Sequence, residues 1–253
     1  MPRFCPKLFI CALIVATCEP SGYAISEVYV QTQFASQPGK YQSLTIAPVV
    51  FAHYGYNQMA TYTNEEVRPA IKSLSDTICS NTIASLITVL TEKNYRVLGV
   101  PRALVTTEDR LELGGKGLTE FDQLHRAFGQ VSGMLHDQKR ANRSGPSEFQ
   151  LAGDASGLVA HLAATNAAAI VFVDERSVLA PTALKAKKHR IIEAGAYAQS
   201  VEYNLGLVDV GTGNLLWWQT GSFQVDAGRE ARQIKDSIRT LLNKLPPAKM
   251  ARQ

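Results

Sequence analysis

Two long stretches of alternating side chains, joined by a glycine-rich connection, restrict the folds open to this chain more than any other sequence feature. Apolar and polar residues alternate from 196 to 209 and again from 215 to 225. Between them, Val210-Gly211-Thr212-Gly213-Asn214 supplies glycine where a tight turn needs a positive φ angle. We therefore predict a long antiparallel hairpin, which must form part of a larger sheet.

Other apolar runs predict the rest of that sheet. Residues 43–51 and 167–173 are apolar with little alternation, which is typical of strands covered on both faces. Pro48 cannot donate a hydrogen bond to a neighbouring strand, so the first of these strands should end there or lie near an edge. A further short strand is predicted over 94–100.

The segments between these strands carry apolar residues at helical spacing. Asn64 followed by two glutamates predicts a helix start, and apolar positions then recur at helical spacing to Leu90. Further helices are predicted at 119–136, capped by Thr119, at 154–165 and at 227–245. The expected fold class is therefore α/β, a mixed sheet with helices packed on it, ending in a long C-terminal hairpin and a final helix.

The N-terminus has the layout of a secretory signal. Arg3 and Lys7 precede an apolar run at 8–16, and a more polar stretch follows. A run of about nine residues is too short to cross a bilayer as a helix, which takes about 20. We expect an exported protein with a signal peptide at 1–24.

Two cleavage points fit that signal. Gly22 and Ala24 are the small residues needed for cleavage after Ala24. Val15-Ala16-Thr17-Cys18 is similar to a lipobox, which would place a lipid on Cys18, although Thr17 departs from the usual small residue. The first outcome predicts a soluble periplasmic protein. The second predicts a lipoprotein, with the outer membrane expected because Glu19 rather than aspartate follows the cysteine.

The mature chain reads as one domain with two insertions. We expect an extended lead-in at 25–42, an α/β domain at 43–245 and a flexible tail at 246–253, with insertions at about 101–150 and 176–195. The second insertion belongs to a predicted excursion from the sheet at 174–192. It carries a local basic cluster, Lys185, Lys187, Lys188 and Arg190. This cluster is too small for a nucleic-acid surface, so no nucleic-acid partner is expected.

The hairpin sequence, with the strand at 44–49 and the helix-then-strand unit at 158–173, resembles a known group. Leu-Val-Asp-x-x-Thr-Gly-x-Leu-Leu-Trp, at 207–217, is similar to the hairpin of envelope lipoproteins related to CsgG, the curli-export component, and of lipoproteins with the fold of the N-terminal domain of TolB. The resemblance implies a periplasmic or outer-membrane-anchored domain without enzymatic activity that helps assemble envelope machines and can oligomerise. Neither insertion has the alternating pattern of a membrane-inserting hairpin, so no pore is expected.

Within the hairpin, each motif residue has a structural interpretation. Asp209 can accept hydrogen bonds from the turn amides, Thr212 can help to close the turn, and Gly213 supplies the backbone freedom. Trp217 and Trp218 point to opposite faces, so we expect one in the core and the other more exposed.

A search for catalytic and metal-binding patterns predicts neither a catalytic residue, a metal site nor a cofactor. His125 and His136 would share similar faces of one helix several turns apart, and we interpret them as surface or capping histidines. Carboxylate neighbours such as Asp109 with Glu112, or Asp174 with Glu175, are interpreted as solvated charges. Cys79 is interpreted as a small buried residue on a helix.

The sequence therefore predicts a non-enzymatic accessory or scaffold protein of an envelope assembly or secretion machine, acting through protein–protein contacts and possible self-association. The expected contact surfaces are the helix at 119–136 and an aromatic loop at 53–62, with Tyr54, Tyr56 and Tyr62, while Trp218 is a further interaction candidate. An alternative is a glycan- or peptidoglycan-binding module whose tyrosines stack on sugar rings. A second alternative is a hydrolase with a site in the 101–150 insertion.

Overall fold

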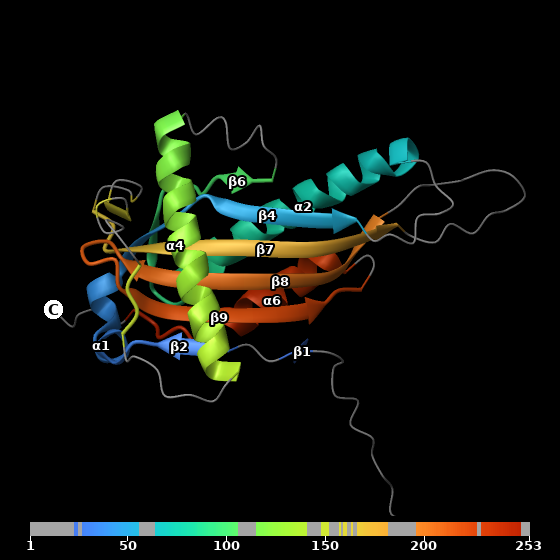
Figure 1. Ribbon diagram of the computed structural model, residues 1–253. Coiled ribbons are helices and arrows are strands. Elements are labelled where there is room, and N and C mark those ends of the chain that lie inside the picture. The colour runs from blue at the N-terminus through green and yellow to red at the C-terminus, as the bar shows by residue number, and fades with distance from the viewer. Residues whose placement is uncertain are drawn as a thin grey trace, which may run out of the picture.

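The computed structural model describes residues 23–24, 27–55, 64–105, 115–140, 148–151, 157, 159–160, 163, 166–181, 196–226 and 229–248. Within these residues, helices lie on both faces of one mixed sheet (Figure 1). The predicted α/β class is therefore confirmed.

The strands and helices have the following bounds. The strands are β1 (Tyr23–Ala24), β2 (Val28–Val30), β3 (Ser43–Ile46), β4 (Val49–Gly55), β5 (Arg96–Leu98), β6 (Ala103–Leu104), β7 (Ala169–Pro181), β8 (Ala196–Asp209) and β9 (Leu215–Gln224). The helices are α1 (Thr32–Ser36), a 3-10 turn (Pro38–Tyr41), α2 (Asn64–Glu92), α4 (Gly115–Arg140) and α6 (Glu230–Leu242).

Strands β7, β8 and β9 form an antiparallel centre, and β3 and β4 run parallel to β7 on its other side. Both strands pair with β7 in succession, since Leu44 lies opposite Ala169 and Val50 opposite Asp174. The break between β3 and β4 falls at Pro48, as predicted. However, β3 is an internal strand, because β5 pairs with its other side.

Side-chain alternation along β7 gives the sheet two apolar faces. Ala169, Val171 and Val173 pack with α2 and α6, whereas Ile170 and Phe172 pack with α4. In Figure 1, α4 crosses in front of the central strands, while α2 and α6 lie behind them. The predicted apolar face of α4 is therefore buried in the protein's own core.

The hairpin of β8 and β9 matches the prediction, but β7 is longer than expected. The predicted excursion at 174–192 is wrong at its start, because β7 continues through Asp174 to Pro181 and pairs with β8 along its length. Polar side chains are tolerated there because one set faces an open cleft and the other set forms internal hydrogen bonds, described below. The α4 helix likewise begins at Gly115, before the predicted cap at Thr119.

The lead-in and the tail also differ from their predictions. Residues 25–42 are not simply extended, because β2 pairs with β9 and Phe34 of α1 is fully buried in the α2 side of the core. At the other end, Tyr95 donates a hydrogen bond to the Pro246 carbonyl at 2.6 Å, and Ala248 is buried. At least the beginning of the predicted tail is thus part of the folded domain.

Most of the helix predicted at 154–165 lies outside the described residues, as do residues 182–195 and the signal segment at 1–22. In the part of the chain that the structure describes, none of the helices combines the length and the apolar character that a membrane span requires.

Candidate functional site: a polar cleft beside helix α4

Helix α4 covers only part of its sheet face, and the packing beneath it explains where the coverage stops. The ring of Phe128 stacks on Phe172 with centroids 5.2 Å apart, and it sits directly over Gly206 of β8. The same row of the sheet continues with Trp218 of β9. The next two rows toward the far end of β7 carry polar side chains instead, so no apolar helix face can cover them without leaving polar groups unpaired.

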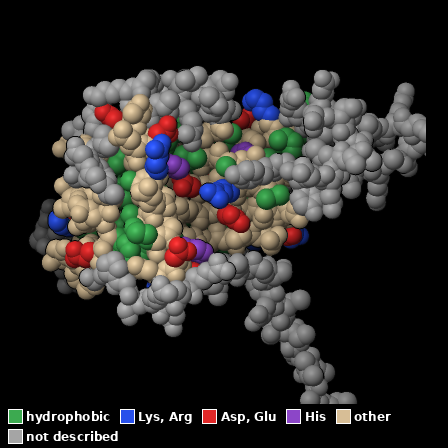
Figure 2. All heavy atoms as spheres, in the orientation of Figure 1, with side chains coloured by type: hydrophobic (Ala, Val, Ile, Leu, Met, Phe, Trp, Pro, Cys, Tyr) green, Lys and Arg blue, Asp and Glu red, His purple; other side chains and the backbone are tan. Residues whose placement is uncertain are grey.

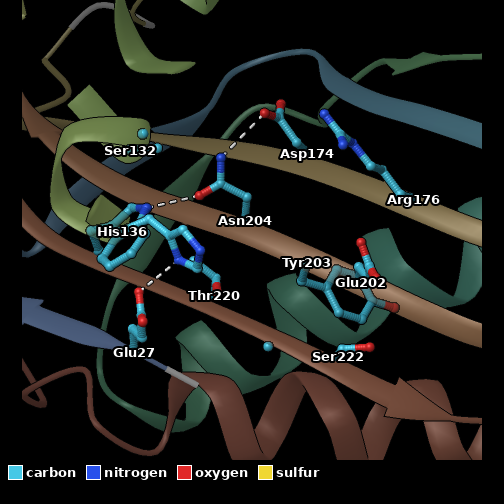
Figure 3. Close-up of a pocket in the computed structure, with 13 residues that line it drawn as sticks. Glu27, Ser132, His136, Asp174, Arg176, Glu202, Tyr203, Asn204, Thr220 and Ser222 are labelled. Atoms are coloured by element: carbon cyan, nitrogen blue, oxygen red, sulfur yellow. Dashed lines mark hydrogen bonds and ion pairs between the residues drawn. The ribbon is translucent and has the colours of Figure 1, made fainter. Parts of the chain in front are cut away.

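These polar rows form the floor of a cleft of about 510 Å³. One row holds Asp174, Asn204 and Thr220, and the next holds Arg176, Glu202 and Ser222. The walls come from α4, with Ser132 and His136, and from Glu27 just before β2 (Figure 3). Figure 2 shows acidic, basic and histidine side chains gathered on this part of the surface beside α4.

The first polar row is fixed by a chain of hydrogen bonds. The Trp218 indole N–H donates to Oδ1 of Asn204 at 2.8 Å, and the Asn204 amide lies 3.4 Å from Oδ2 of Asp174. Nε2 of His125, on α4, lies 2.5 Å from Oδ1 of Asp174. Both carboxylate oxygens of Asp174 are therefore already engaged, which makes this group a docking point for α4.

A second histidine of α4 makes a similar contact at the other end of the cleft. Nδ1 of His136 lies 2.8 Å from Oε2 of Glu27. His125 and His136 thus fix α4 to the sheet and to the lead-in. His136 is exposed, as predicted, and His125 is half-buried, but the sequence did not predict their partners, because each partner is far away in the sequence.

The second polar row, together with Thr220 of the first row, is not engaged by any described side chain. No hydrogen bond or ion pair within the described residues engages the side chains of Arg176, Glu202, Thr220 or Ser222. Ser132 is only 7% exposed, and its hydroxyl also has no partner among the described groups. The cleft therefore offers a carboxylate, a guanidinium and hydroxyls to an incoming polar ligand.

A different polar cluster lies on the opposite face of β7, beneath α2. Glu175 is 1% exposed, and it accepts hydrogen bonds from Thr82 at 2.7 Å and from Ser177 at 2.6 Å. The Tyr203 hydroxyl lies 3.1 Å from that of Thr82, and His53 lies 3.7 Å from Glu175 without a hydrogen bond. Burial, and then the neighbouring Glu175 carboxylate, raise the pKa of Tyr203 well above its ordinary value. This cluster is closed to solvent, so it serves the packing of α2.

The interpretation of Asp174 and Glu175 as solvated charges is therefore wrong. They are neighbours in one strand and point to opposite faces, so one is hydrogen-bonded at the cleft and the other is buried. Asp109 and Glu112 lie outside the described residues.

The tryptophan pair needs a similar correction. Trp217 and Trp218 point to opposite faces as predicted, but both are 1% exposed. Trp218 was expected to be the more exposed interaction residue, yet it is covered by α4. It lines the cleft with little exposed surface, and its indole N–H donates a hydrogen bond to Asn204 there. The side chains of Tyr54, Tyr56 and Tyr62 lie outside the described part, so their interaction role stays a prediction.

The hairpin motif takes the predicted structural form. Oδ1 of Asp209 accepts hydrogen bonds from the backbone N–H groups of Gly211 at 2.7 Å and Thr212 at 3.1 Å. The Thr212 hydroxyl accepts one from the N–H of Asn214, and Gly213 has a φ angle of 72°. The sequence did not predict the contact from Tyr41, whose hydroxyl donates to Oδ2 of Asp209 at 2.9 Å.

Most of the cleft residues were missed by sequence reasoning, although a signal for them exists. Polar residues occupy alternate positions at the far halves of all three central strands, at 174 and 176, 202 and 204, and 220 and 222. Only the strand register shows that these pairs share one face. No group of three metal-ligating side chains occurs among the residues that can be described.

Comparison with known proteins gives structural neighbours but no family. No family model matches the chain, and no curated protein matches it. The PelC dodecamer from Paraburkholderia phytofirmans is 12% identical, with 88% of this chain and 97% of that chain covered and a TM-score of 0.28. Lipoprotein GNA1162 from Neisseria meningitidis is 12% identical, with 81% and 99% covered and a TM-score of 0.29. The Evf virulence factor is 7% identical, with 79% and 81% covered and a TM-score of 0.22.

Proposed function

We propose that this chain is a non-enzymatic envelope protein, an accessory or scaffold component of an assembly or secretion machine that acts through protein–protein contacts. The N-terminal residue pattern supports export. The CsgG-related hairpin resemblance supports an assembly role, and the polar cleft supplies a surface for a partner.

The single observation that carries the proposal is the position of the N-terminal segment. Tyr23 pairs with Phe223, and Val28–Val30 pairs with Trp217–Gln219, so the segment is held along one edge of the sheet. Tyr23 follows Cys18 by five residues, which span at most about 18 Å when fully extended. A lipid on Cys18 would therefore keep the folded domain close to the membrane surface, beside other envelope components.

The state of the cleft supports binding rather than catalysis. Asp174 has both oxygens engaged, and Glu27 is paired with His136. Glu202 lies on the same sheet surface as Asp174, one row further along. Two carboxylates that act on a glycosidic bond must instead face each other across the substrate. Arg176, Glu202, Thr220 and Ser222, whose side chains no described residue engages, suit hydrogen bonding to a bound partner.

The first test is the intact mass of the protein from the membrane fraction of its native host. Cleavage before Cys18 with an added diacylglycerol and acyl chain is the expected result. Cross-linking in intact cells should then recover envelope proteins, with cross-links in the cleft residues. A cleaved, unlipidated protein that cross-links to nothing would overturn the proposal, as would turnover that is lost on changing a cleft residue.

A glycan-binding role is the second candidate, because the free groups of the cleft are also donors and acceptors for sugar hydroxyls. Its weakness is that the aromatic side chains among the described lining residues, Tyr203 and Trp218, are both buried. Sedimentation with insoluble peptidoglycan separates the two roles. Retention that is lost in Glu202→Gln and Ser222→Ala, but kept in Asp76→Asn on the other face, would favour the glycan. Protein left in the supernatant would exclude this candidate.

A further inference from the structure

We infer that the second polar row of the cleft binds a small zwitterion, a ligand that carries an ammonium group and an oxyanion a few bonds apart. A free α-amino acid is such a ligand, and so is a phosphoethanolamine headgroup. The inference rests on the proposed function in one respect, that the cleft is a binding surface, and it adds the class of ligand. It is carried by the charges of the row, by their lack of internal partners and by an unsatisfied hydroxyl in the cleft wall.

The second polar row places one positive and one negative group side by side. Arg176 of β7 lies directly opposite Glu202 of β8, and Ser222 of β9 follows in the same row. Side chains at directly opposite positions have Cβ atoms only about 5 Å apart. These two described side chains nevertheless form no ion pair with each other, and in Figure 3 the guanidinium of Arg176 extends away from Glu202. The two charges are close enough to serve one small ligand, and neither neutralises the other.

The other carboxylates of the cleft already have partners. Asp174 and Glu27 each lie against a histidine of α4. Arg176 and Glu202 are therefore the charged lining groups that no described side chain engages. The cleft thus presents one charge of each sign to a ligand.

This combination of charges distinguishes between classes of ligand. An anion bound at Arg176 would lie beside the Glu202 carboxylate, and a cation bound at Glu202 would lie beside the Arg176 guanidinium, so each would be repelled by the neighbouring group. A neutral ligand would cover both charges without fully replacing the hydration that they lose. A zwitterion meets both groups with the opposite sign. Its oxyanion can accept two parallel N–H bonds from the guanidinium, and its ammonium can donate to the carboxylate.

Hydroxyl groups around the row can accept the remaining hydrogen bonds of the ammonium. An ammonium carries three N–H donors and no acceptor. Ser222 lies beside Glu202 in the same row, and Thr220 lies one row back on the same strand. No described side chain engages either hydroxyl, so the ligand would displace no internal side-chain hydrogen bond.

The wall formed by α4 gives an independent indication of a ligand. Ser132 lines the cleft and is 7% exposed, but its hydroxyl has no hydrogen-bond partner among the described groups. An unpaired buried hydroxyl costs stability, and most buried polar side-chain atoms in folded proteins are paired. A polar atom of a bound ligand supplies the missing partner.

The size of the cleft also suits a small ligand. Its volume of about 510 Å³ falls within the range of about 300–1,000 Å³ that is typical of small-molecule sites. The two charges occupy one row only. The rest of the cleft therefore leaves room for the side chain or the glycerol group that a zwitterion carries.

The test is a titration of residues 23–253, which include every residue that the structure describes, followed by the NMR shifts of backbone amides. L-alanine is compared with N-acetyl-L-alanine, which lacks the ammonium, and with L-alanine amide, which lacks the carboxylate. Glycerophosphoethanolamine is compared in the same way with glycerol phosphate and with ethanolamine. The first set represents a free amino acid, and the second represents a lipid headgroup.

At least one zwitterion should bind about tenfold or more tightly than either of its singly charged analogues, because only the zwitterion pairs with both charges. The largest shifts should fall at the amides of Glu202, Thr220 and Ser222. The set that shows the preference identifies the source of the ligand.

Three variants test the contacts at the two ends of the ligand and in the wall. Arg176→Gln should abolish the preference for the zwitterion over the analogue without an oxyanion, and Glu202→Gln the preference over the analogue without an ammonium. Ser132→Ala should weaken zwitterion binding without destabilising the ligand-free protein, because it removes an unpaired hydroxyl. Asp76→Asn on α2 and Lys235→Gln on α6 are the matched controls. Both residues are exposed on helices of the opposite sheet face, so both variants should bind like wild type (Figure 1).

Two results would overturn the inference. One is that neither zwitterion binds more tightly than its singly charged analogues, and the other is that the three test variants bind like the two controls. Neither result touches the proposed function, which is read from cross-links in intact cells. Conversely, zwitterion binding by the purified protein would stand even if those cross-links were absent.

Discussion

At the scale of single residues, Asp209 connects the hairpin turn to the N-terminal segment. One carboxylate oxygen accepts hydrogen bonds from two turn amides, and the other accepts one from the Tyr41 hydroxyl. The first set is local, so the sequence motif predicts it. The Tyr41 contact joins residues 168 positions apart, and no local sequence pattern predicts such a contact.

Removing the Tyr41 hydroxyl should destabilise the protein moderately. Tyr41→Phe keeps the buried ring but leaves Oδ2 of Asp209 without this donor, so we expect a loss of about 1–2 kcal/mol in the free energy of unfolding. Urea denaturation at neutral pH measures it. In an Asp209→Asn background the same change should cost clearly less, and an equal cost in both backgrounds would show that the hydrogen bond is not the cause.

The same residue predicts how stability changes at high pH. Burial, followed by the hydrogen bond to Asp209, raises the pKa of Tyr41 from 10.0 to about 12. The folded state therefore favours the neutral phenol, and this contribution is complete below pH 10 and is lost as the pH rises toward 12. The stability difference between wild type and Tyr41→Phe should shrink over that range. Denaturation curves of both proteins measured between pH 10 and pH 12 test this prediction. A stability difference that stays constant over that range would contradict it.

At the scale of elements, α4 shows which features of the fold a sequence can reveal. Its apolar positions Phe121, Leu124, Phe128, Val131 and Leu135 were identified from spacing alone, and all are buried. The surface against which they pack was not identified, because the sequence alone does not show which face of the sheet a helix covers. The cleft was missed for the same reason, since its polar residues come from three strands whose register only the structure gives.

The contact between α4 and β8 predicts the effect of two glycine substitutions. A Cβ atom at Gly206 would collide with the ring of Phe128, so Gly206→Ala should push α4 away from the sheet and cost about 1–3 kcal/mol. At Gly129, on α4 itself, a Cβ atom meets nothing within 4 Å. Gly129→Ala should therefore be neutral or stabilise by up to about 1 kcal/mol. Thermal unfolding of both variants tests the pair, and equal effects would contradict the packing described here.

At the scale of the whole molecule, the folded domain is larger than the one predicted from the apolar runs in the sequence. Phe34 and Tyr41 from the predicted lead-in belong to the α2 side of the core, and so does Ala248 from the predicted tail. Both segments are short and mostly polar, so a search for long apolar runs excludes them. Their burial depends on surfaces supplied by distant strands and helices.

A chain that starts at residue 43 should therefore fold poorly. It lacks β2 and the buried rings of Phe34 and Tyr41, each of which contributes roughly 2–3 kcal/mol through burial. Natural domains are stable by only about 5–15 kcal/mol, so the loss is a large share of the total. Circular dichroism during heating should show a broad or absent transition. Residues 25–253, which lack only β1, should unfold cooperatively like residues 23–253.

The edge pairing of β2 also determines when the fold can be completed during synthesis. Val28 pairs with Gln219, about 190 positions later, so β2 cannot pair until β9 has been synthesised. Until β9 is made, β2 has no strand to pair with, so this edge of the sheet cannot form before then. Such high contact order slows folding.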